Sequence, residues 1–427
     1  MQYNLDIRKK QEFDVVVVGA GPAGISAAVS SARMGLNTAL VERYGIVGGS
    51  LTIGCVGPLM GNVSKGTIVD EFKQLLQIKE PYGAVAHDFE HAKTVLTDLV
   101  NKSNISLMLQ TPVVEAVKDG ERLTGLIVGT KNGLEEIGGK VFIDATGDGT
   151  VSYLAGAETR FGREGDGLVQ PVTIMFTLAG IDDSKAISPQ HNTYYVRLAD
   201  SGFREKCREA ARKGLLPKNA SFVRLYRTNR PNECMVNASQ ENYINGLDTD
   251  DLARAESSLR EQTNIIRDFL RNNVAGFENC YVTGSSETLG VRETRRVMGE
   301  YMLTAEDLLT GRKFKDAVVS EADFILDIHN PAGAEQADDR RVKPYDIPYR
   351  CLVPLKVEGL LTSGRCISGT HEAHGSYRVM YICMATGHAA GIAAALSAKH
   401  NVLPRELDYR LLRRELLNLG IRLSKIE

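Results

Sequence analysis

The stretch from Asp14 to Arg43, DVVVVGAGPAGISAAVSSARMGLNTALVER, constrains the fold more than any other part of this chain. It opens with an apolar run typical of a strand that is buried on both faces of a parallel sheet. Glycines follow at G-x-G-x-x-G spacing, and small residues from Pro22 onward predict a helix. A second apolar run at 37–41 completes a strand–turn–helix–strand unit. Such a unit predicts an α/β fold in which helices cover a parallel sheet.

Each glycine of the turn is required at its position for a different physical reason. Gly19 allows the tight turn, Gly21 lets a pyrophosphate approach the backbone, and Gly24 lets the helix pack against the strand. The helix start then points free N–H groups at the phosphates. Glu42 follows 18 residues after Gly24, where a carboxylate accepts hydrogen bonds from the adenosine ribose. Strand, glycines, helix and acid together favour a Rossmann-like dinucleotide site over an ordinary turn with a solvated Glu42.

Composition excludes several classes of protein. A chain of 427 residues has material for two or three domains. A net charge of -2 gives no broad basic field for nucleic acid. No apolar stretch is expected to cross a membrane. Seven cysteines lie far apart without C-x-x-C spacing, which favours a reducing, cytoplasmic location without disulfides. No metal site is expected, because the H-E-x-H run at 371–374 lacks an evident third ligand.

Further glycine-rich segments extend the nucleotide signature. A double glycine follows in RYGIVGGSLTIGCVGPLMG, KVFIDATGDGTV occupies 140–151, and GLLTSGRCISGTHEAHGSYRVM begins at 359. With these motifs the chain resembles the FAD-dependent oxidoreductases of the glutathione-reductase-like superfamily. Within that superfamily it is most similar to the family related to fumarate reductase flavoproteins. The resemblance is specific at 13–56, 140–151, 286–310 and 347–395, and vague at 157–280.

The resemblance implies a noncovalently bound FAD, because the histidine of covalent flavoproteins of the succinate-dehydrogenase type is missing. It implies that the glycine turn holds the diphosphate, that the main chain near 113–114 touches the adenine region, and that the start of the last long helix lies by the flavin pyrimidine ring. The implied cofactor contacts are Gly19, Gly21, Pro22, Ala23, Gly24, Glu42, Arg43, Gly49, Ser50, Val113, Val114, Ala145, Thr146, Gly147, Gly364, Arg365, Arg378, Val379 and Met380. A second G-x-G-x-x-G is missing, so no separate NAD(P)H domain is expected.

The predicted organisation is discontinuous. Residues 1–156 form the first half of the FAD-binding domain, 157–345 an inserted α+β substrate domain, and 346–427 the second half with a C-terminal helix. A hairpin turn is predicted at 119–120, and helices are predicted near 199–214 and 249–273, the second capped by Thr249. The polar, proline-containing segment before 346 reads as a surface crossing.

Candidate catalytic groups each have a structural alternative. Cys55 is a redox thiol or, by preference, a small buried residue in a glycine-rich loop. His371 and His374, read as loop residues beside the flavin, transfer a proton, bind substrate or serve only structure. Tyr349 and Arg350 either face the flavin or brace the crossing between domains.

The motif GVRETRR places Arg292, Arg295 and Arg296 at i, i+3 and i+4, which share one face if the segment is helical. The resemblance implies arginines over the flavin that hold substrate carboxylates, and guanidinium suits this role through paired hydrogen bonds. Glu293 and Glu300 offer the same arginines ion pairs instead. Arg292 is the preferred substrate ligand.

The favoured function is hydride transfer between flavin N5 and a small anionic substrate, with a separate electron acceptor or donor. One alternative is a flavin-dependent thiol or sulfur-transfer enzyme that uses Cys55. Another is a flavin electron-carrier subunit without its own substrate, which the insertion at 157–345 disfavours. A homo-oligomer is compatible with all three.

Overall fold

The computed structural model describes residues 6–78, 85–186, 201–220, 222–334 and 336–425. Its amino-terminal unit consists of β1 (Ile7–Val18), α1 (Pro22–Arg33) and β2 (Thr38–Val41). β1 pairs in parallel with β2, from Val15 opposite Thr38 to Val18 opposite Val41. The valines of β1 are almost fully buried. The predicted strand–turn–helix–strand unit is therefore confirmed.

The main sheet has the order β4-β2-β1-β7-β6-β5, and β18 pairs with the far half of β7. The added strands are β4 (Ser106–Met108), β5 (Val113–Asp119), β6 (Arg122–Thr130), β7 (Gly133–Asp144) and β18 (Leu360–Thr362). β5 and β6 form the predicted hairpin, with Gly120 in the left-handed region at its turn. Because β1, β2, β7 and β18 run in parallel, their carboxyl ends meet at one edge of the sheet.

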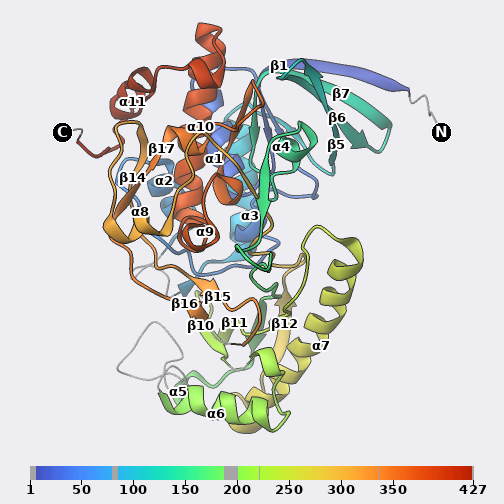
Figure 1. The fold of residues 1–427 in the computed structure, drawn as a ribbon. Helices are drawn as coiled ribbons and strands as arrows, with labels where there is room; N and C mark the ends of the chain where they lie inside the picture. Colours follow the sequence, from blue (N-terminus) through green and yellow to red (C-terminus); the bar gives the residue numbers. More distant parts are fainter. Residues whose placement is uncertain (1–5, 79–84, 187–200, 221, 335, 426–427) are drawn as a thin grey trace.

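Helices cover this sheet in a layered α/β arrangement, which confirms the predicted fold class (Figure 1). They are α2 (Ile68–Leu75), α3 (Phe89–Lys102), α4 (Thr150–Leu154), α8 (Ala305–Thr310), α9 (His371–Tyr377), α10 (Met380–His400) and α11 (Tyr409–Asn418). α10 is long and apolar enough to cross a bilayer, but 94% of its apolar window is buried inside the protein. It packs along α1 as a core helix.

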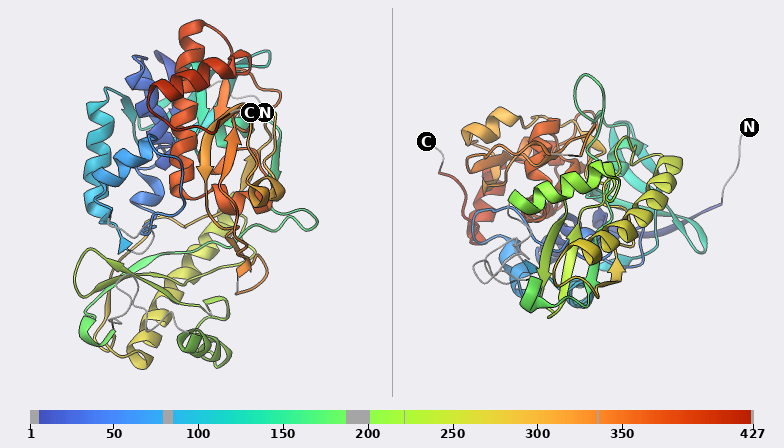
Figure 2. Two further views of the ribbon diagram at one scale, coloured as in Figure 1. Left: turned by 90° about the vertical axis from the view of Figure 1, so that its left-hand side faces the viewer. Right: turned by 90° about the horizontal axis from the view of Figure 1, so that it is seen from below.

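A second lobe is built on a sheet of order β12-β9-β11-β10-β3. Its elements are β3 (Val85–Ala86), β9 (Phe176–Ala179), α5 (Asp183–Ala186), α6 (Ser201–Arg212), β10 (Arg224–Thr228), β11 (Glu233–Asn237), α7 (Thr249–Asn273) and β12 (Tyr281–Ser285). Helices α6 and α7 contribute Phe203 and Phe269 to one core with Phe176 of the sheet. Figure 2 shows this lobe below the main sheet in a view at right angles to Figure 1. The N-cap of α7 is Asp248 rather than the predicted Thr249, because the Asp248 carboxylate accepts two backbone N–H bonds.

Three short two-stranded sheets complete the fold. They pair β8 (Thr159–Phe161) with β13 (Arg295–Val297), β14 (Ala317–Ala322) with β17 (Tyr345–Pro348), and β15 (Ile328–His329) with β16 (Gln336–Asp338). The sheet formed by β14 and β17 packs in the core of the first lobe.

The domain boundaries differ from the predicted ones at two places. Leu303, Leu308 and Val318 belong to the same hydrophobic core as α1 and α10, so the chain returns to the first lobe well before residue 345. It leaves that core again for β15 and β16. In addition, β3 from the first segment joins the second sheet. Local composition did not reveal these crossings, because each rests on a contact between residues far apart in the sequence.

Candidate functional site

The glycine turn is packed so tightly that side chains cannot replace it. Gly19 has φ +94°, its N–H donates to the Val41 carbonyl at 2.7 Å, and an added Cβ would lie 2.6 Å from the Ala145 carbonyl oxygen. A Cβ on Gly24 would lie 1.7 Å from the Gly19 oxygen. Gly21 meets nothing within 4 Å, so its backbone is open to an approaching phosphate. The three glycine roles read from the sequence agree with this geometry.

Glu42 is buried at the end of β2 and holds the turn in place. Its Oε2 accepts the N–H of Ala20 at 2.6 Å, and its Oε1 accepts the N–H of Tyr44 at 2.9 Å. The carboxylate therefore fixes the phosphate loop in addition to facing the predicted ribose position. The Glu42 carbonyl accepts the N–H of Thr111, which leads into β5 at Val113. Val113 and Val114 therefore begin a strand that starts close to the end of β2, and their contact with adenine stays a prediction.

The double glycine lies against the first turn. The N–H of Gly48 donates to the Ala20 carbonyl at 2.7 Å. A Cβ on Gly49 would lie 3.1 Å from the Gly21 Cα. Gly49 and Ser50 open the short 3-10 turn Gly49–Leu51. Two loops separated in sequence thus share one cradle.

The third loop, at the end of β7, is shaped by Asp144. This buried carboxylate accepts hydrogen bonds from the N–H and hydroxyl groups of Thr146 and Ser152. Ala145 lies directly under Gly19, and Gly147 has φ +75° with the Arg365 guanidinium against it. All three predicted A-T-G residues therefore line the same edge.

Two arginines assigned to the cofactor meet at Asp148. Arg365 contacts this carboxylate at 2.7 Å and Arg43 at 3.5 Å. Asp148 thus holds both guanidinium groups at the loop that follows β7, and the charge of Glu42 also acts on Arg43.

The fourth loop joins β18 to α10. Gly364 has φ +75°, and its N–H donates to the Thr386 hydroxyl at 3.0 Å. α10 begins at Met380 after Val379, and no side chain caps it. Its free N–H groups suit a partial negative charge on a bound ring. In each of these four loops, a glycine keeps the backbone free of a Cβ. Helices α1 and α10 both begin without a side-chain cap, so their N–H groups are free. Both features suit the binding of a flavin dinucleotide.

The segment around GVRETRR is extended rather than helical, which corrects the shared-face interpretation. Arg295 and Arg296 lie in β13, paired with β8. Arg296 donates to Glu293, the Gly369 carbonyl and the Gly162 carbonyl. All three nitrogens of its guanidinium group therefore have hydrogen-bond acceptors within the protein. Arg295 stacks on the Tyr153 ring at 3.9 Å. Neighbouring residues of a strand point to opposite faces, so these two arginines do not share the predicted face, and the partners of both favour the structural alternative.

Arg292 lies in a different environment, which we call the arginine cluster: Arg224, Arg292 and Arg378 with Asp327 and His329. Arg378 pairs with Asp327 at 2.7 Å, and Arg224 donates to Gln336, which in turn donates to Asp327. Arg292 donates to the Pro171 carbonyl at 2.6 Å. The cluster draws on β10, β15 and the α9–α10 junction, between the two lobes (Figure 1).

The electrostatics of the cluster favour a bound anion. Three guanidinium groups face one carboxylate, so two positive charges are in excess. Burial, followed by Arg378, lowers the pKa of Arg292 to about 9, which leaves it charged at neutral pH. Burial opposes ionisation of Asp327, but His329 and the arginines lower its pKa to about 2. The Nε of Arg378 and the Nε2 of Gln170 are buried without a hydrogen-bond partner among the described residues.

The sequence matches the FAD dependent oxidoreductase family over residues 14–416. The chain belongs to this family. Its cofactor is accordingly FAD, and it is an enzyme.

Individual relatives of this family member match over shorter stretches. A dihydrolipoyl dehydrogenase of Vibrio cholerae serotype O1 is 31% identical over 120 residues, which cover 27% of this chain and 25% of the relative. A tRNA uridine 5-carboxymethylaminomethyl modification enzyme of Fusobacterium nucleatum is 32% identical over 183 residues, which cover 35% of this chain and 29% of the relative. The chain thus spans about a quarter of the length of the first of these relatives.

Solved structures share the fold. A geranylgeranyl bacteriochlorophyll reductase-like protein of Thermoplasma acidophilum matches with a TM-score of 0.50 and 12% identity, over 96% of this chain and 84% of that one. A flavin-dependent brominase matches with a TM-score of 0.51 and 11% identity, over 96% of this chain and 83% of the brominase. At this identity the likeness concerns the fold of the oxidoreductase alone.

The two predicted histidines lie in α9 rather than in a loop, after the N-cap Thr370. The Nδ1 of His371 lies 2.9 Å from Glu293, which also pairs with Arg296. Burial, followed by Arg296, lowers the pKa of His374 well below its usual value. Its Nδ1 is buried without a partner among the described residues. His371 therefore belongs to a structural network, and His374 is a neutral core residue.

Tyr349 and Arg350 brace the structure. The Tyr349 hydroxyl donates to the Pro404 carbonyl at 2.8 Å, and Arg350 pairs with Asp316 at 2.9 Å. These contacts favour the bracing role over a place at the flavin.

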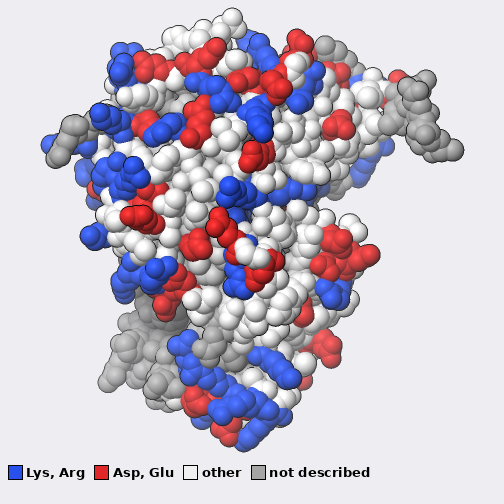
Figure 3. Space-filling model, in the orientation of Figure 1, with Lys and Arg blue, Asp and Glu red and all other residues white. Residues whose placement is uncertain are grey.

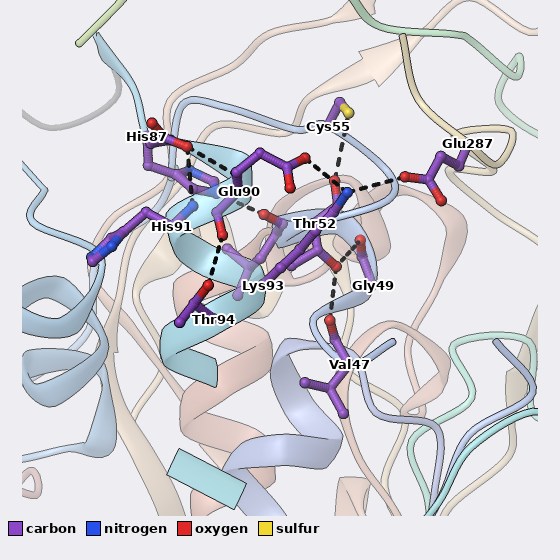
Figure 4. Close-up of polar contacts among 12 residues, drawn as sticks. Val47, Gly49, Thr52, Cys55, His87, Glu90, His91, Lys93, Thr94 and Glu287 are labelled. Carbon is purple, nitrogen blue, oxygen red and sulfur yellow. Dashed lines mark hydrogen bonds and ion pairs between the residues drawn. The ribbon is translucent and has the colours of Figure 1, made fainter. Parts of the chain in front are cut away.

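Cys55 adopts φ +49°, and its thiol donates to the Thr52 carbonyl at 3.5 Å (Figure 4). Burial raises its pKa to about 11, although the nearby Lys93 opposes this. Lys93 itself lies between Glu90 and Glu287 and ties α3 to the second lobe. A thiol with such a pKa is protonated at neutral pH and is a poor nucleophile. All seven cysteines are free.

Asp327, His329 and Arg224 were missed by the sequence reasoning. They lie in the part of the chain where the resemblance is vague or where a surface crossing was predicted. The signal that points to them is the run DFILDIHNP, in which Asp327 and His329 alternate with apolar residues and thus share one face of a short strand.

Proposed function

We propose that this FAD-dependent oxidoreductase transfers a hydride between the flavin and a small anionic organic substrate that the arginine cluster binds. The observation that carries the proposal is the excess of positive charge at the buried Arg292 and the partly buried Arg224 and Arg378, with the Nε of Arg378 and the Nε2 of Gln170 left unpaired among the described residues. A buried charge is stable only with a partner, and a carboxylate provides two parallel acceptors for a guanidinium.

The position of the cluster supports the same proposal. Arg378 directly precedes Val379 and Met380, where α10 begins and where the flavin ring is expected. A substrate bound to Arg378 and Arg292 would thus be held beside the cofactor. Bound FAD supplies a two-electron hydride acceptor or donor at flavin N5. The chain orients the substrate carboxylate, excludes water through the second lobe, and neutralises the substrate charge.

Other readings have less support. The thiol or sulfur-transfer alternative needs a reactive Cys55, yet burial raises the pKa of this thiol to about 11. An electron-carrier subunit binds no substrate of its own, so the anion site between the two lobes disfavours this alternative. A cytoplasmic location and a separate electron acceptor or donor remain part of the proposal, in keeping with seven free cysteines. On the face in Figure 3, acidic and basic side chains are interspersed without a field of one sign.

The first prediction tests this site with Arg292→Met, which removes the charge and the donors but keeps most of the side-chain length. Binding of small carboxylates is followed by the absorbance change of oxidised flavin under anaerobic conditions. We expect the variant to keep FAD and to bind the anion roughly tenfold to a hundredfold more weakly, because a charge-assisted hydrogen bond contributes about 1.5–3 kcal/mol.

Arg254→Met is the matched control, since Arg254 is an exposed residue of α7 that pairs only with Asp251 among the described residues. It should bind carboxylates as the wild type does. An Arg292→Met variant with unchanged anion affinity would contradict the assignment. Loss of FAD by that variant would place Arg292 on the cofactor instead.

A further inference from the structure

His329 is a nearly buried imidazole whose ring has no hydrogen bond among the described residues. The residue is 9% exposed and its side chain 11%, and its backbone N–H donates to the Gln170 side-chain oxygen at 3.2 Å. Its Nε2 lies 3.7 Å from the Oδ2 of Asp327, beyond hydrogen-bond reach. A largely buried ring that the described residues leave without a hydrogen bond is available to a bound partner.

The groups around His329 come from every element of the cluster. Arg224 lies on β10, Arg292 on the extended segment before β13, Arg378 at the start of α10, and Asp327 beside the ring. Burial, followed by Arg292, lowers the pKa of His329 well below its usual value, and only Asp327 acts in the opposite direction. The ring is therefore neutral at pH 7 and holds a free lone pair.

We propose that His329 is the general base of this site and that the substrate is a small 2-hydroxy carboxylate, oxidised at the carbon that carries the hydroxyl. The proposal rests on the proposed function and names its substrate class and direction. The base lies among the guanidinium groups that bind the carboxylate. The proton that it removes must therefore lie close to that carboxylate in the substrate, which a hydroxyl on the neighbouring carbon satisfies.

The step balances as follows. The substrate O–H bond breaks, and its proton passes to Nδ1 of His329. The C–H bond on the same carbon breaks, and its electron pair leaves as hydride to oxidised FAD. A carbon–oxygen double bond forms, so that a 2-hydroxy acid becomes a 2-oxo acid. The substrate loses two electrons, and FAD gains them.

The tautomer and the direction follow from the neighbours. Nε2 faces Asp327 at 3.7 Å, so the carboxylate charge favours the proton on Nε2 without a hydrogen bond, and the lone pair of Nδ1 is left for the substrate. Asp327 stays ionised and stabilises the imidazolium that forms, as a carboxylate does beside a catalytic histidine. Reduction of a 2-oxo acid would instead require a protonated His329 before the reaction, which three arginines disfavour.

The test uses His329→Gln in the FAD-loaded enzyme, with His400→Gln as the control because His400 is exposed at the end of α10. The probes are glycolate, both lactates and both malates, with acetate, propionate and succinate as partners that lack the hydroxyl. We expect wild type and control to lose flavin absorbance with at least one hydroxy acid. His329→Gln should bind that acid within about threefold of wild-type affinity but reduce flavin a hundredfold to ten-thousandfold more slowly.

A second readout does not depend on turnover. In histidine-labelled holoenzyme, NMR should show a ring signal that is absent in His329→Gln and that stays neutral, with the proton on Nε2, from pH 6 to pH 8. A ring that titrates near pH 6.5 would overturn the proposal. So would wild-type flavin reduction by His329→Gln, or flavin bleaching by succinate without bleaching by any hydroxy acid.

These outcomes separate the two proposals. If the oxidised wild-type enzyme binds none of the carboxylates, the proposed function fails together with this inference. If carboxylates bind through Arg292 but His329→Gln reacts at the wild-type rate, the anion site stands and the base assignment fails.

Discussion

At the scale of single residues, the partners of a side chain decide its role more than its motif does. Arg292 and Arg296 are four residues apart in GVRETRR. Arg296 donates hydrogen bonds to Glu293 and two backbone carbonyls, whereas Arg292 donates to one backbone carbonyl. The same holds for the titratable groups. Cys55, a candidate nucleophile from its position, is kept as a thiol by burial. His329 lies outside the motifs that the sequence analysis singled out, and its place beside the arginines and Asp327 is the basis on which we propose it as a base.

Glu42 gives the second testable prediction, at the adenosine end of the site. Its carboxylate accepts the N–H groups of Ala20 and Tyr44. Glu42→Ala leaves both buried donors without an acceptor, at a cost of about 1–3 kcal/mol each, and removes the predicted ribose ligand. We expect FAD affinity to fall at least tenfold when apoprotein is titrated with FAD.

Glu121→Ala serves as the control, because Glu121 is exposed in the β5–β6 turn region. It should take up FAD with wild-type affinity. If Glu42→Ala does so as well, Glu42 only fixes the turn and the ribose assignment is wrong.

At the scale of elements, helix α10 depends on glycines that allow close contact with α1. An added Cβ on Gly387 would lie 2.0 Å from the Ala23 oxygen, and one on Gly391 would lie 2.2 Å from the Ala27 oxygen. The contacted atoms belong to the backbone, which cannot rotate away. The close approach holds the start of α10 beside the glycine turn, so that the packing of these helices positions two parts of the cofactor site.

Gly387→Ala is therefore expected to destabilise the protein. Alanine gains about 1 kcal/mol in helix propensity, but forcing the backbones apart costs about 1–3 kcal/mol or more. The clash should prevail because a separation of 2.0 Å requires the whole helix to move. Denaturant unfolding of the holoenzyme measures the change.

Gly284→Ala in β12 provides the comparison, since its added Cβ would meet nothing within 4 Å. Its unfolding free energy should stay close to the wild-type value. A Gly387→Ala protein that is as stable as this control would show that α1 and α10 have room to separate.

At the scale of the whole molecule, one cofactor site is assembled from both ends of the chain. The loops at 19–24, 42–50 and 145–149 come from the first segment, and the loop at 363–366 comes from the last. The second lobe then places the arginine cluster against the start of α10. Folding of the two chain segments onto one sheet is thus a condition for binding FAD.

The last prediction follows from this arrangement. The cysteine nearest the α10 start, Cys383, has a pKa that burial raises to about 12, so it is no nucleophile toward the flavin. We expect acid precipitation to release free FAD into the supernatant. Since FAD binds only the folded chain, its removal should also lower Tm. Flavin that stays with the precipitated protein would contradict noncovalent binding.

The sequence by itself determined the parts of this protein that depend on neighbours along the chain. Buried valines, a glycine turn in which Gly19 and Gly24 tolerate no Cβ, and an acid at the end of the second strand lie within 30 residues of each other, and they predicted the FAD-binding unit. The hairpin at Gly120 and the helix α7 followed from local pattern in the same way.

Tertiary structure alone decided the rest. The GVRETRR segment has helical spacing but is extended, because β13 finds hydrogen-bond partners in β8, more than a hundred residues earlier. The return of residues 303–326 to the first core and the meeting of Arg224, Arg292, Asp327 and Arg378 also depend on distant contacts. Charge excess and burial are properties of such assembled groups. A sequence states which charges exist, and only the fold determines which of them are left without a partner.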